Sequence, residues 1–185
     1  MLYFCIMKKY FLIFLFLIGF TSFSQNKEGD AIKLYEQKSY EESRELFQEL
    51  STEEPNNANV QEYLANIAFD LKEYKKAAGL IKPLMDRYPD IARYHFKYAG
   101  AIGLYCKNNK IKGAFLIDDI KEHFHKAIDL DNTFLDAYIG LVHLYVELPA
   151  IFGGSKEKAL MYADHVKNLD PKAGIEVMKL ITSAD

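Results

Sequence analysis

The sequence has 185 residues, half of them apolar, and a formal net charge of −3. This apolar share excludes a disordered chain, and the length fits a domain of ordinary size. No basic stripe stands out, which argues against nucleic acid as a partner. The 13 Tyr and 13 Phe residues suit interfaces between helices, where large side chains fill the space between ridges.

The N-terminal segment 1–24 is predicted to be a secretory signal peptide. Lys8 and Lys9 precede an apolar run of 11 residues, 10–20, which is short for a membrane span of about 20 residues. Ser22 and Ser24 occupy the −3 and −1 positions for cleavage before Gln25. Met7 is an alternative start, and an uncleaved anchor, the one route to membrane contact, is the competing interpretation. The pattern predicts an exported protein, periplasmic or secreted.

Cleavage would leave Cys106 as the sole cysteine of the mature chain and a net charge of −5, from 21 basic and 26 acidic residues. A single cysteine forms no internal disulfide, so stability has to come from packing. Cys106 follows the apolar stretch 101–105. This position predicts a buried thiol rather than a reactive one.

A repeat spacing of about 34 residues organises the rest of the chain. Pro55 and Pro89 stand one such spacing apart, and the residues before them match in type at that interval. Self-similarity at this period is typical of stacked helix–turn–helix units, none of which buries its apolar face alone. The matching positions of the second unit are Leu64, Ala65, Ala68, Tyr74, Ala77, Ile81, Leu84 and Pro89. Those of the first unit are Ala31, Leu34, Tyr40, Ser43, Phe47, Leu50 and Pro55.

This pattern resembles the tetratricopeptide repeat. The resemblance implies an all-α fold: a right-handed α-solenoid of about four helix–turn–helix units with a C-terminal capping helix. The predicted segments are repeat 1 (25–57), repeat 2 (58–91), repeat 3 (92–134), repeat 4 (135–171), and the capping helix with its tail (172–185). Ile175, Met178 and Ile181 are expected on one face of the capping helix.

Repeats 3 and 4 are longer than the first two, and the excess falls in their turns, around 107–113 and 148–155. Ser155 is predicted to cap the helix that follows. The turns carry the apolar residues Ile111, Phe115, Leu116, Pro149, Ile151 and Phe152. The favoured interpretation is a small satellite core in which these side chains cover each other, and the alternative is an exposed apolar patch for a partner.

Motifs for catalysis or cofactors are weak. His123 and His125 are two residues apart, which places them on different sides of a helix and does not suit a metal pair. The run Gly153-Gly154-Ser155-Lys156 lacks the order of a phosphate-binding loop, so a flexible turn with a helix cap is favoured over an anion nest. The sequence predicts no metal site and no cofactor, and it does not predict an enzyme.

The resemblance implies that the first helix of each repeat lines a concave groove that holds a ligand. By position, the contacts would be Asn59, Glu62, Asn66, Phe69 and Asp70 in repeat 2, Arg93, Phe96 and Gly100 in repeat 3, and Asp136, Ile139, His143 and Glu147 in repeat 4. Asn66 matches an asparagine that holds a peptide backbone in this family. Glu62 stands where members that clamp a carboxylate have lysine, which argues against recognition of a C-terminal carboxylate.

These observations favour a module for protein–protein or protein–peptide interaction in the cell envelope, with no nucleic acid as partner. The alternative is a receptor or accessory binding protein for a small molecule or an envelope component. A third possibility is an enzyme, which clustered ionisable residues with perturbed pKa values in a cleft would favour. For the groove residues, the competing interpretation is that they only solvate the inner face. An enclosed pocket with convergent polar groups would favour the receptor, and an open groove would favour the peptide partner.

Overall fold

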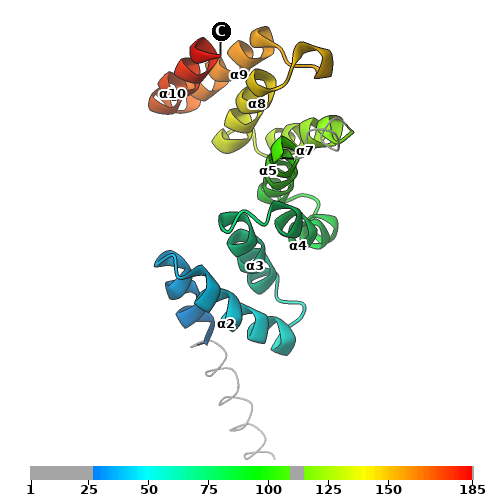
Figure 1. Ribbon diagram of the computed structural model, residues 1–185, viewed down its shortest axis with the longest axis vertical. Helices are drawn as coiled ribbons and strands as arrows, with labels where there is room; N and C mark the ends of the chain where they lie inside the picture. The colour runs from blue at the N-terminus through cyan, green and yellow to red at the C-terminus, as the bar shows by residue number, and fades with distance from the viewer. Residues whose placement is uncertain (1–26, 109–114, 185) are drawn as a thin grey trace, which may run out of the picture. The chain divides into compact units, whose positions relative to one another are not determined.

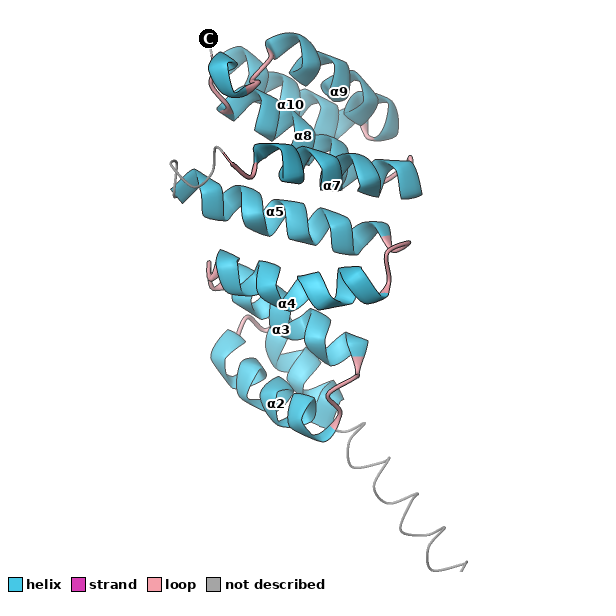
Figure 2. Cartoon of the chain, turned by 90° about the vertical axis from the view of Figure 1, so that its right-hand side faces the viewer, coloured by secondary structure: helices cyan, strands magenta, loops and turns pink. Residues whose placement is uncertain are grey.

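The computed structural model describes residues 27–108 and 115–184. Over these ranges the chain forms helices joined by turns and contains no strand (Figures 1 and 2). The predicted all-α fold is therefore confirmed. The predicted signal peptide lies outside the described residues, as do Ile111 and most of the long turn of repeat 3. None of the described helices combines the length and the apolar character needed to cross a membrane.

The chain divides into two compact units, residues 1–71 and 72–185, called here the N-terminal and C-terminal units. The described part of the N-terminal unit contains a helix over 27–36, α2 (Tyr40–Glu53) and α3 (Ala58–Asp70). Helices α2 and α3 pack against each other. The buried side chains of this unit are Ala31, Ser43, Phe47, Leu50, Val60, Leu64, Ala65, Ile67 and Ala68.

Ser43 explains how a polar residue fits a core position. It stands where the next repeat has Ala77, and it is fully buried. Its hydroxyl donates a hydrogen bond of 2.8 Å to the backbone carbonyl of Ala31. A buried hydroxyl is tolerated when it has such a partner. The small side chain therefore keeps the close packing of the repeat without leaving an unsatisfied polar group.

The repeat spacing also appears in the backbone. Lys38 and Lys72 stand one repeat spacing apart, and both have positive φ, 63° and 61°. The amide of Ser39 donates to the carbonyl of Leu34 at 3.0 Å, and that of Lys38 donates to Tyr35 at 2.9 Å. This is a Schellman motif, which ends a helix with one left-handed residue. Glycine usually fills that position, so the sequence pattern alone does not reveal it.

The C-terminal unit is a longer run of helices. Its elements are α4 (Tyr74–Arg87), α5 (Ala92–Asn108), α7 (Ile117–Leu130), α8 (Leu135–Glu147), the short 3₁₀ helix η1 (Ala150–Phe152), α9 (Lys156–Leu169) and α10 (Pro171–Ser183). The α-helices that follow one another pack against each other from α4 to α10. The side-by-side course of α5 and α7 is visible in both views (Figures 1 and 2).

Close packing in this unit depends on Gly140 of α8. A Cβ atom on Gly140 would lie 2.5 Å from the ring of Phe124, which is buried in α7. The same ring belongs to a core cluster with Ala127, Leu141 and Tyr138. Because interiors are closely packed, the absence of a side chain at Gly140 allows the close approach of α8 to the Phe124 ring of α7.

The two long turns correct one prediction. Phe115, Ile151 and Phe152 are 87%, 85% and 45% exposed, so these side chains do not form a covered satellite core. Pro149 is exposed as well, and only Leu116 is half-buried, beside the main core.

Local hydrogen bonding in the turn of repeat 4 explains this exposure. The amides of Phe152 and Gly154 donate to the carbonyl of Pro149, and that of Gly153 donates to Ala150. Backbone hydrogen bonds within the turn therefore hold the conformation of η1. The apolar side chains of the turn remain exposed to solvent.

The predicted apolar face of the last helix is also partly wrong. In α10, Gly174, Val177 and Ile181 are buried, whereas Ile175 is 57% exposed and Met178 38% exposed. The buried face is set by Gly174, where a Cβ atom would lie 2.6 Å from the backbone of Lys167 in α9. The close approach of α9 at this glycine turns Ile175 and Met178 away from the core.

Candidate partner-binding site

The predicted contacts of repeat 2 lie on the side of α3 that the core does not bury. Asn59 and Asp70 are exposed, and Phe69 is 36% exposed. Glu62 and Asn66 are half-buried. The core-facing residues of the same helix are Val60, Leu64, Ala65, Ile67 and Ala68. One side of α3 therefore holds the fold, and the other presents two amides, two carboxylates and an aromatic ring.

The structure brings Tyr35, from helix 27–36, onto the same side. Its hydroxyl donates a hydrogen bond of 2.7 Å to the carboxylate of Asp70. Its ring meets that of Tyr63 edge-on, with centroids 5.4 Å apart, and Tyr63 stacks on Phe47 at 4.8 Å. Burial, followed by the bond to Asp70, raises the pKa of Tyr35. Tyr35 and Tyr63 therefore join helix 27–36 to α3 along the predicted binding side.

Three carboxylates act on the pKa of the Tyr63 hydroxyl. Its pKa is raised first by burial, and then by the negative charges of Glu36, Glu28 and Glu62. Glu28 and Glu62 stand one repeat spacing apart, and so do Glu36 and Asp70. The two repeats therefore place acids at the same two positions. The sequence analysis missed Glu28 and Glu36, although the repeat spacing applied to the acids of repeat 2 would have found them.

We call this surface the acidic face. It combines the four acids at repeated positions with the neighbouring aromatic side chains. Its members are Glu28, Glu36, Glu62, Asp70, Tyr35, Tyr63 and Phe69.

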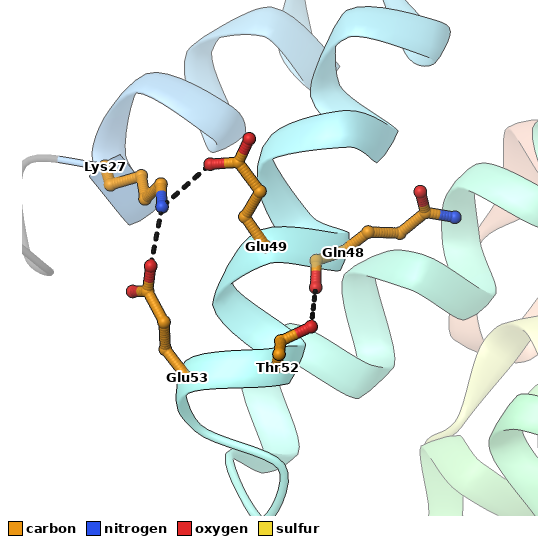
Figure 3. A network of polar contacts seen from close by, with 5 residues as sticks. All are labelled: Lys27, Gln48, Glu49, Thr52 and Glu53. Carbon is orange, nitrogen blue, oxygen red and sulfur yellow. Dashed lines mark hydrogen bonds and ion pairs between the residues drawn. The ribbon is translucent and has the colours of Figure 1, made fainter.

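The basic residue next to Glu28 points elsewhere. The ammonium of Lys27 lies 2.8 Å from the carboxylates of both Glu49 and Glu53 on α2 (Figure 3). These two hydrogen bonds raise the pKa of Lys27. Arg44 also lies on α2, 3.6 Å from Glu41. Both cations therefore have carboxylate partners on α2.

The predicted contacts in the C-terminal unit are more mixed. Arg93 is exposed, with its guanidinium 4.9 Å from the centre of the Tyr94 ring. Phe96 is half-buried, and its ring lies 5.3 Å from Phe134 and 6.1 Å from Phe124. Phe96 therefore contributes to the core of the unit.

On α8, Asp136 is exposed, while Ile139 is half-buried against the same core. His143 is exposed, and its Nδ1 lies 3.6 Å from the carboxylate of Glu147. Lys107 of α5 lies 2.9 Å from the same carboxylate. Of the positions predicted on α8, Asp136, His143 and Glu147 are exposed, while Ile139 serves partly to hold the fold.

A histidine pair links α5 and α7. The Nδ1 atoms of His95 and His123 are 3.0 Å apart, and Nε2 of His95 is 2.8 Å from the carbonyl of Pro89. Because a carbonyl only accepts, Nε2 of His95 carries a proton, and one more proton lies between the two Nδ1 atoms. Burial and the charge of His95 lower the pKa of His123, while Asp119, 3.5 Å away, works against them. No group of three His, Cys, Asp or Glu suited to a metal occurs among the described residues.

The glycine turn before α9 has its amides occupied. The amides of Gly153, Gly154 and Ser155 all donate to backbone carbonyls within 145–150. The hydroxyl of Ser155 accepts from the amide of Lys158 at 3.2 Å. The predicted helix cap at Ser155 is confirmed. An anion nest in this turn is not supported, because its donors are already used.

The thiol of Cys106 is buried, with 8% of the residue exposed, as predicted. Burial, followed by the charge of Asp119, raises its pKa. A raised pKa keeps the sulfur as a neutral thiol, which is a poor nucleophile.

Comparison with known proteins agrees with this geometry. Residues 34–105 match the family model described as tetratricopeptide repeat. Residues 34–105 are therefore similar to tetratricopeptide repeats. Such repeats are binding scaffolds rather than catalysts, so the match agrees with the prediction that the chain is not an enzyme. No curated protein sequence is similar enough to serve as a relative.

Several solved structures have a similar fold, and two of the following three are described as tetratricopeptide-repeat proteins. The protein TTC0263 of Thermus thermophilus superposes with a TM-score of 0.69 at 16% identity, covering 87% of this chain and 80% of that one. YrrB, described as a repeat protein with an unusual peptide-binding site, gives 0.65 at 16% identity, covering 84% of this chain and 74% of that one. MamA of Desulfovibrio magneticus RS-1 gives 0.60 at 18% identity, covering 88% and 77%. At these identities the likeness concerns the fold alone.

Proposed function

We propose that this protein is a scaffold for protein or peptide binding in the cell envelope, and that partners bind to the accessible sides of the first helices of its repeats. The observation that carries the proposal is the two-sided character of α3. Its apolar side is buried, whereas Asn59, Asn66, Phe69 and Asp70 remain at least partly accessible. Accessible amides suit a peptide backbone, and an accessible ring suits an apolar side chain.

Two further observations support the proposal. Tetratricopeptide repeats generally bind proteins or peptides, and one similar structure is described as having a peptide-binding site. The envelope location rests on the sequence of residues 8–24, where two lysines, a short apolar run and small residues follow one another. Mass spectrometry of the protein isolated from the envelope fraction tests this point. We expect a mature chain that begins at Gln25, and an intact N-terminus would contradict cleavage.

Capture experiments with paired variants test the binding surface. The double variant Asn66→Ala with Phe69→Ala removes an amide and a ring from α3 and leaves the buried side of the helix unchanged. We expect it to retain its circular dichroism spectrum and thermal midpoint while it captures less partner from the native envelope fraction.

A matched control is Asn168→Ala with Phe152→Ala, which removes the same two groups from exposed positions in α9 and the long turn. It should capture as much partner as the unmodified protein. The reverse outcome, in which only the control loses capture, would contradict binding through α3 and point to the long turn.

A further inference from the structure

The contact between α5 and α7 includes two histidine rings that face each other. The Nδ1 atoms of His95 and His123 are 3.0 Å apart, whereas the ring centres are 5.2 Å apart. The two nitrogens therefore point toward each other, as a hydrogen bond between the rings requires. His95 is buried, with 6% of the residue exposed, and His123 is half-buried. This bond between two titratable groups lies in a helix contact with little access to water.

The outer nitrogen of each ring also has a partner. Nε2 of His95 donates to the carbonyl of Pro89 at 2.8 Å, and Nε2 of His123 lies 3.5 Å from the carboxylate of Asp119. The four ring nitrogens thus have places for three protons: one at Pro89, one between the rings and one facing Asp119. A fourth proton would set one N–H against another between the rings. Full protonation of both histidines is therefore incompatible with their hydrogen bond.

Groups on three helices act on His123. Burial has the largest effect and lowers its pKa, and the charge of Lys82 on α4 acts in the same direction. Asp119 and Glu122 on α7 favour the protonated ring instead. The ring of Tyr98 on α5 meets His123 edge-on, with centroids 4.9 Å apart. The closed contact therefore binds fewer protons than two histidines in water would.

We propose that the histidine pair is a pH-sensitive switch, which holds α5 against α7 while the rings share one proton and opens this contact when both rings are fully protonated. The inference goes beyond the proposed function, because it concerns a contact between helices rather than a binding surface. Arg93 and Phe96, two of the predicted partner contacts, stand within two residues of His95 on α5. Opening would therefore disturb that part of the predicted surface.

The size of the response follows from proton uptake. In the open contact both rings meet water and titrate near the ordinary histidine pKa of about 6.5. In the closed contact the pair accepts at most one additional proton, the one that faces Asp119. Opening therefore takes up one or two protons once the pH falls below about 6.5. The open fraction should rise about tenfold to a hundredfold between pH 7.5 and pH 5.5.

Cys106 allows the opening to be measured. Its thiol is buried and belongs to the same core cluster as Ile120 and Phe124 of α7. Separation of α5 from α7 would make the thiol accessible to a reagent. The full chain is labelled with 4,4′-dithiodipyridine, which reacts with thiols in acid and in neutral solution. Mass spectrometry of the peptide that carries Cys106 gives the labelling rate. Dividing it by the rate in urea-unfolded protein at the same pH removes the pH dependence of the thiol itself.

Paired variants separate the two histidines from other titrating groups. In the unmodified protein we expect the rate ratio to rise at least about tenfold from pH 7.5 to pH 5.5. The double variant His95→Gln with His123→Gln should show a rise of less than about threefold. The matched control His143→Gln with His165→Gln removes two exposed histidines from α8 and α9. It should keep the response of the unmodified protein.

A rate ratio that does not change with pH in the unmodified protein would overturn the inference. An equal rise in the double variant would also overturn it, because the opening would then belong to other groups. If the double variant does not fold, each single variant should show a smaller rise than the unmodified protein, and an undiminished rise in both would contradict the switch. Circular dichroism at pH 5.5 should match that at pH 7.5, and a lost helical signal would mean global unfolding instead of a local opening.

Discussion

The two units use the same repeat positions for different purposes. In the N-terminal unit, the corresponding positions of the first helices carry Glu28 and Glu62, whose negative charges help to raise the pKa of Tyr63. In the C-terminal unit, the positions that correspond to Glu62 carry Phe96 and Ile139, which are half-buried in the core. The repeat fixes the position of a residue on its helix. The type of residue then determines whether its side chain is exposed to a partner or packs into the core.

Glycine residues in the C-terminal unit show the same difference between the two units. Helix α5 carries Gly100 and Gly103, where an added Cβ atom would meet nothing within 4 Å. Glycine offers a partner only backbone, whereas the acidic face offers carboxylates, hydroxyls and rings. Under the proposed function, specific recognition would fall to the N-terminal unit, while the longer C-terminal unit provides much of the packed core.

The largest expected effect comes from charging the shared core position of the two units. Ala77→Glu and Ser43→Glu each bury a carboxylate at a site that is at most 2% exposed. Each should destabilise the protein by about 3 kcal/mol or more, since an unpaired buried charge is costly. Thermal unfolding followed by circular dichroism measures the loss.

Gly79→Glu is the control, because Gly79 is exposed and open on the same helix as Ala77. It should leave the thermal midpoint nearly unchanged. Full thermal stability of Ala77→Glu would refute the assignment of repeat 2. If only Ser43→Glu kept full thermal stability, positions 43 and 77 would not be equivalent.

The next effect concerns helix approach within the C-terminal unit. Gly140→Ala forces a methyl group against the buried ring of Phe124, at 2.5 Å. We expect a loss of about 1–3 kcal/mol from overpacking. Gly103→Ala, at an open helical position, should instead stabilise the protein by about 0.5–1 kcal/mol. Urea unfolding measures the change in stability of both variants. A stabilising effect of Gly140→Ala would show that the contact between α7 and α8 can accommodate a methyl group.

A smaller effect is expected when Ser43 is replaced by alanine, the residue type that repeat 2 has at the corresponding position. Ser43→Ala removes the hydrogen bond to the carbonyl of Ala31. The expected loss of stability is about 1 kcal/mol, the usual net value of such a bond. Ser183→Ala, at an exposed position in α10, should lose less than about 0.5 kcal/mol. A Ser43→Ala variant as stable as the unmodified protein would mean that packing alone matters at this position.

The histidine pair predicts a pH effect confined to the C-terminal unit. The pKa of His123 is lowered in the folded protein, so the unfolded chain binds more protons once the pH falls toward the ordinary value of about 6.5. Stability should be complete above that pH and should decline as the pH falls below it, until the folded protein also takes up the proton.

Urea unfolding at pH 7.5 and pH 5.5 measures this decline, and His123→Gln should reduce it. His143→Gln, at an exposed position, should leave it unchanged. An unaltered decline in His123→Gln would assign the pH dependence to other groups.

Much of the fold could be predicted from the sequence, because the repeat spacing carries the positions of small and large core residues. Ala77 and Phe47 are buried as that pattern requires, and Ser155 caps its helix. The left-handed residues Lys38 and Lys72 were not foreseen, since lysine carries no signal for that backbone conformation. The exposed Phe152 was also missed, because apolar character alone does not show which way a turn directs a side chain.

The binding site was predictable only in part. The positions on α3 follow from the resemblance, but helical position could not show that Phe134 and Phe124 would draw Phe96 into the core. The contact between Tyr35 and Asp70 joins two different helices of the N-terminal unit. Contacts of this kind depend on how the helices pack, which a spacing rule does not supply.

Hydrogen exchange tests most directly whether the N-terminal unit is the recognition unit. Amide exchange of the purified protein is compared with and without a saturating amount of the partner captured from the envelope fraction. We predict slower exchange in helix 27–36 and α3, with little change in α5 and α8. Slower exchange confined to α5 and α8 would contradict that assignment.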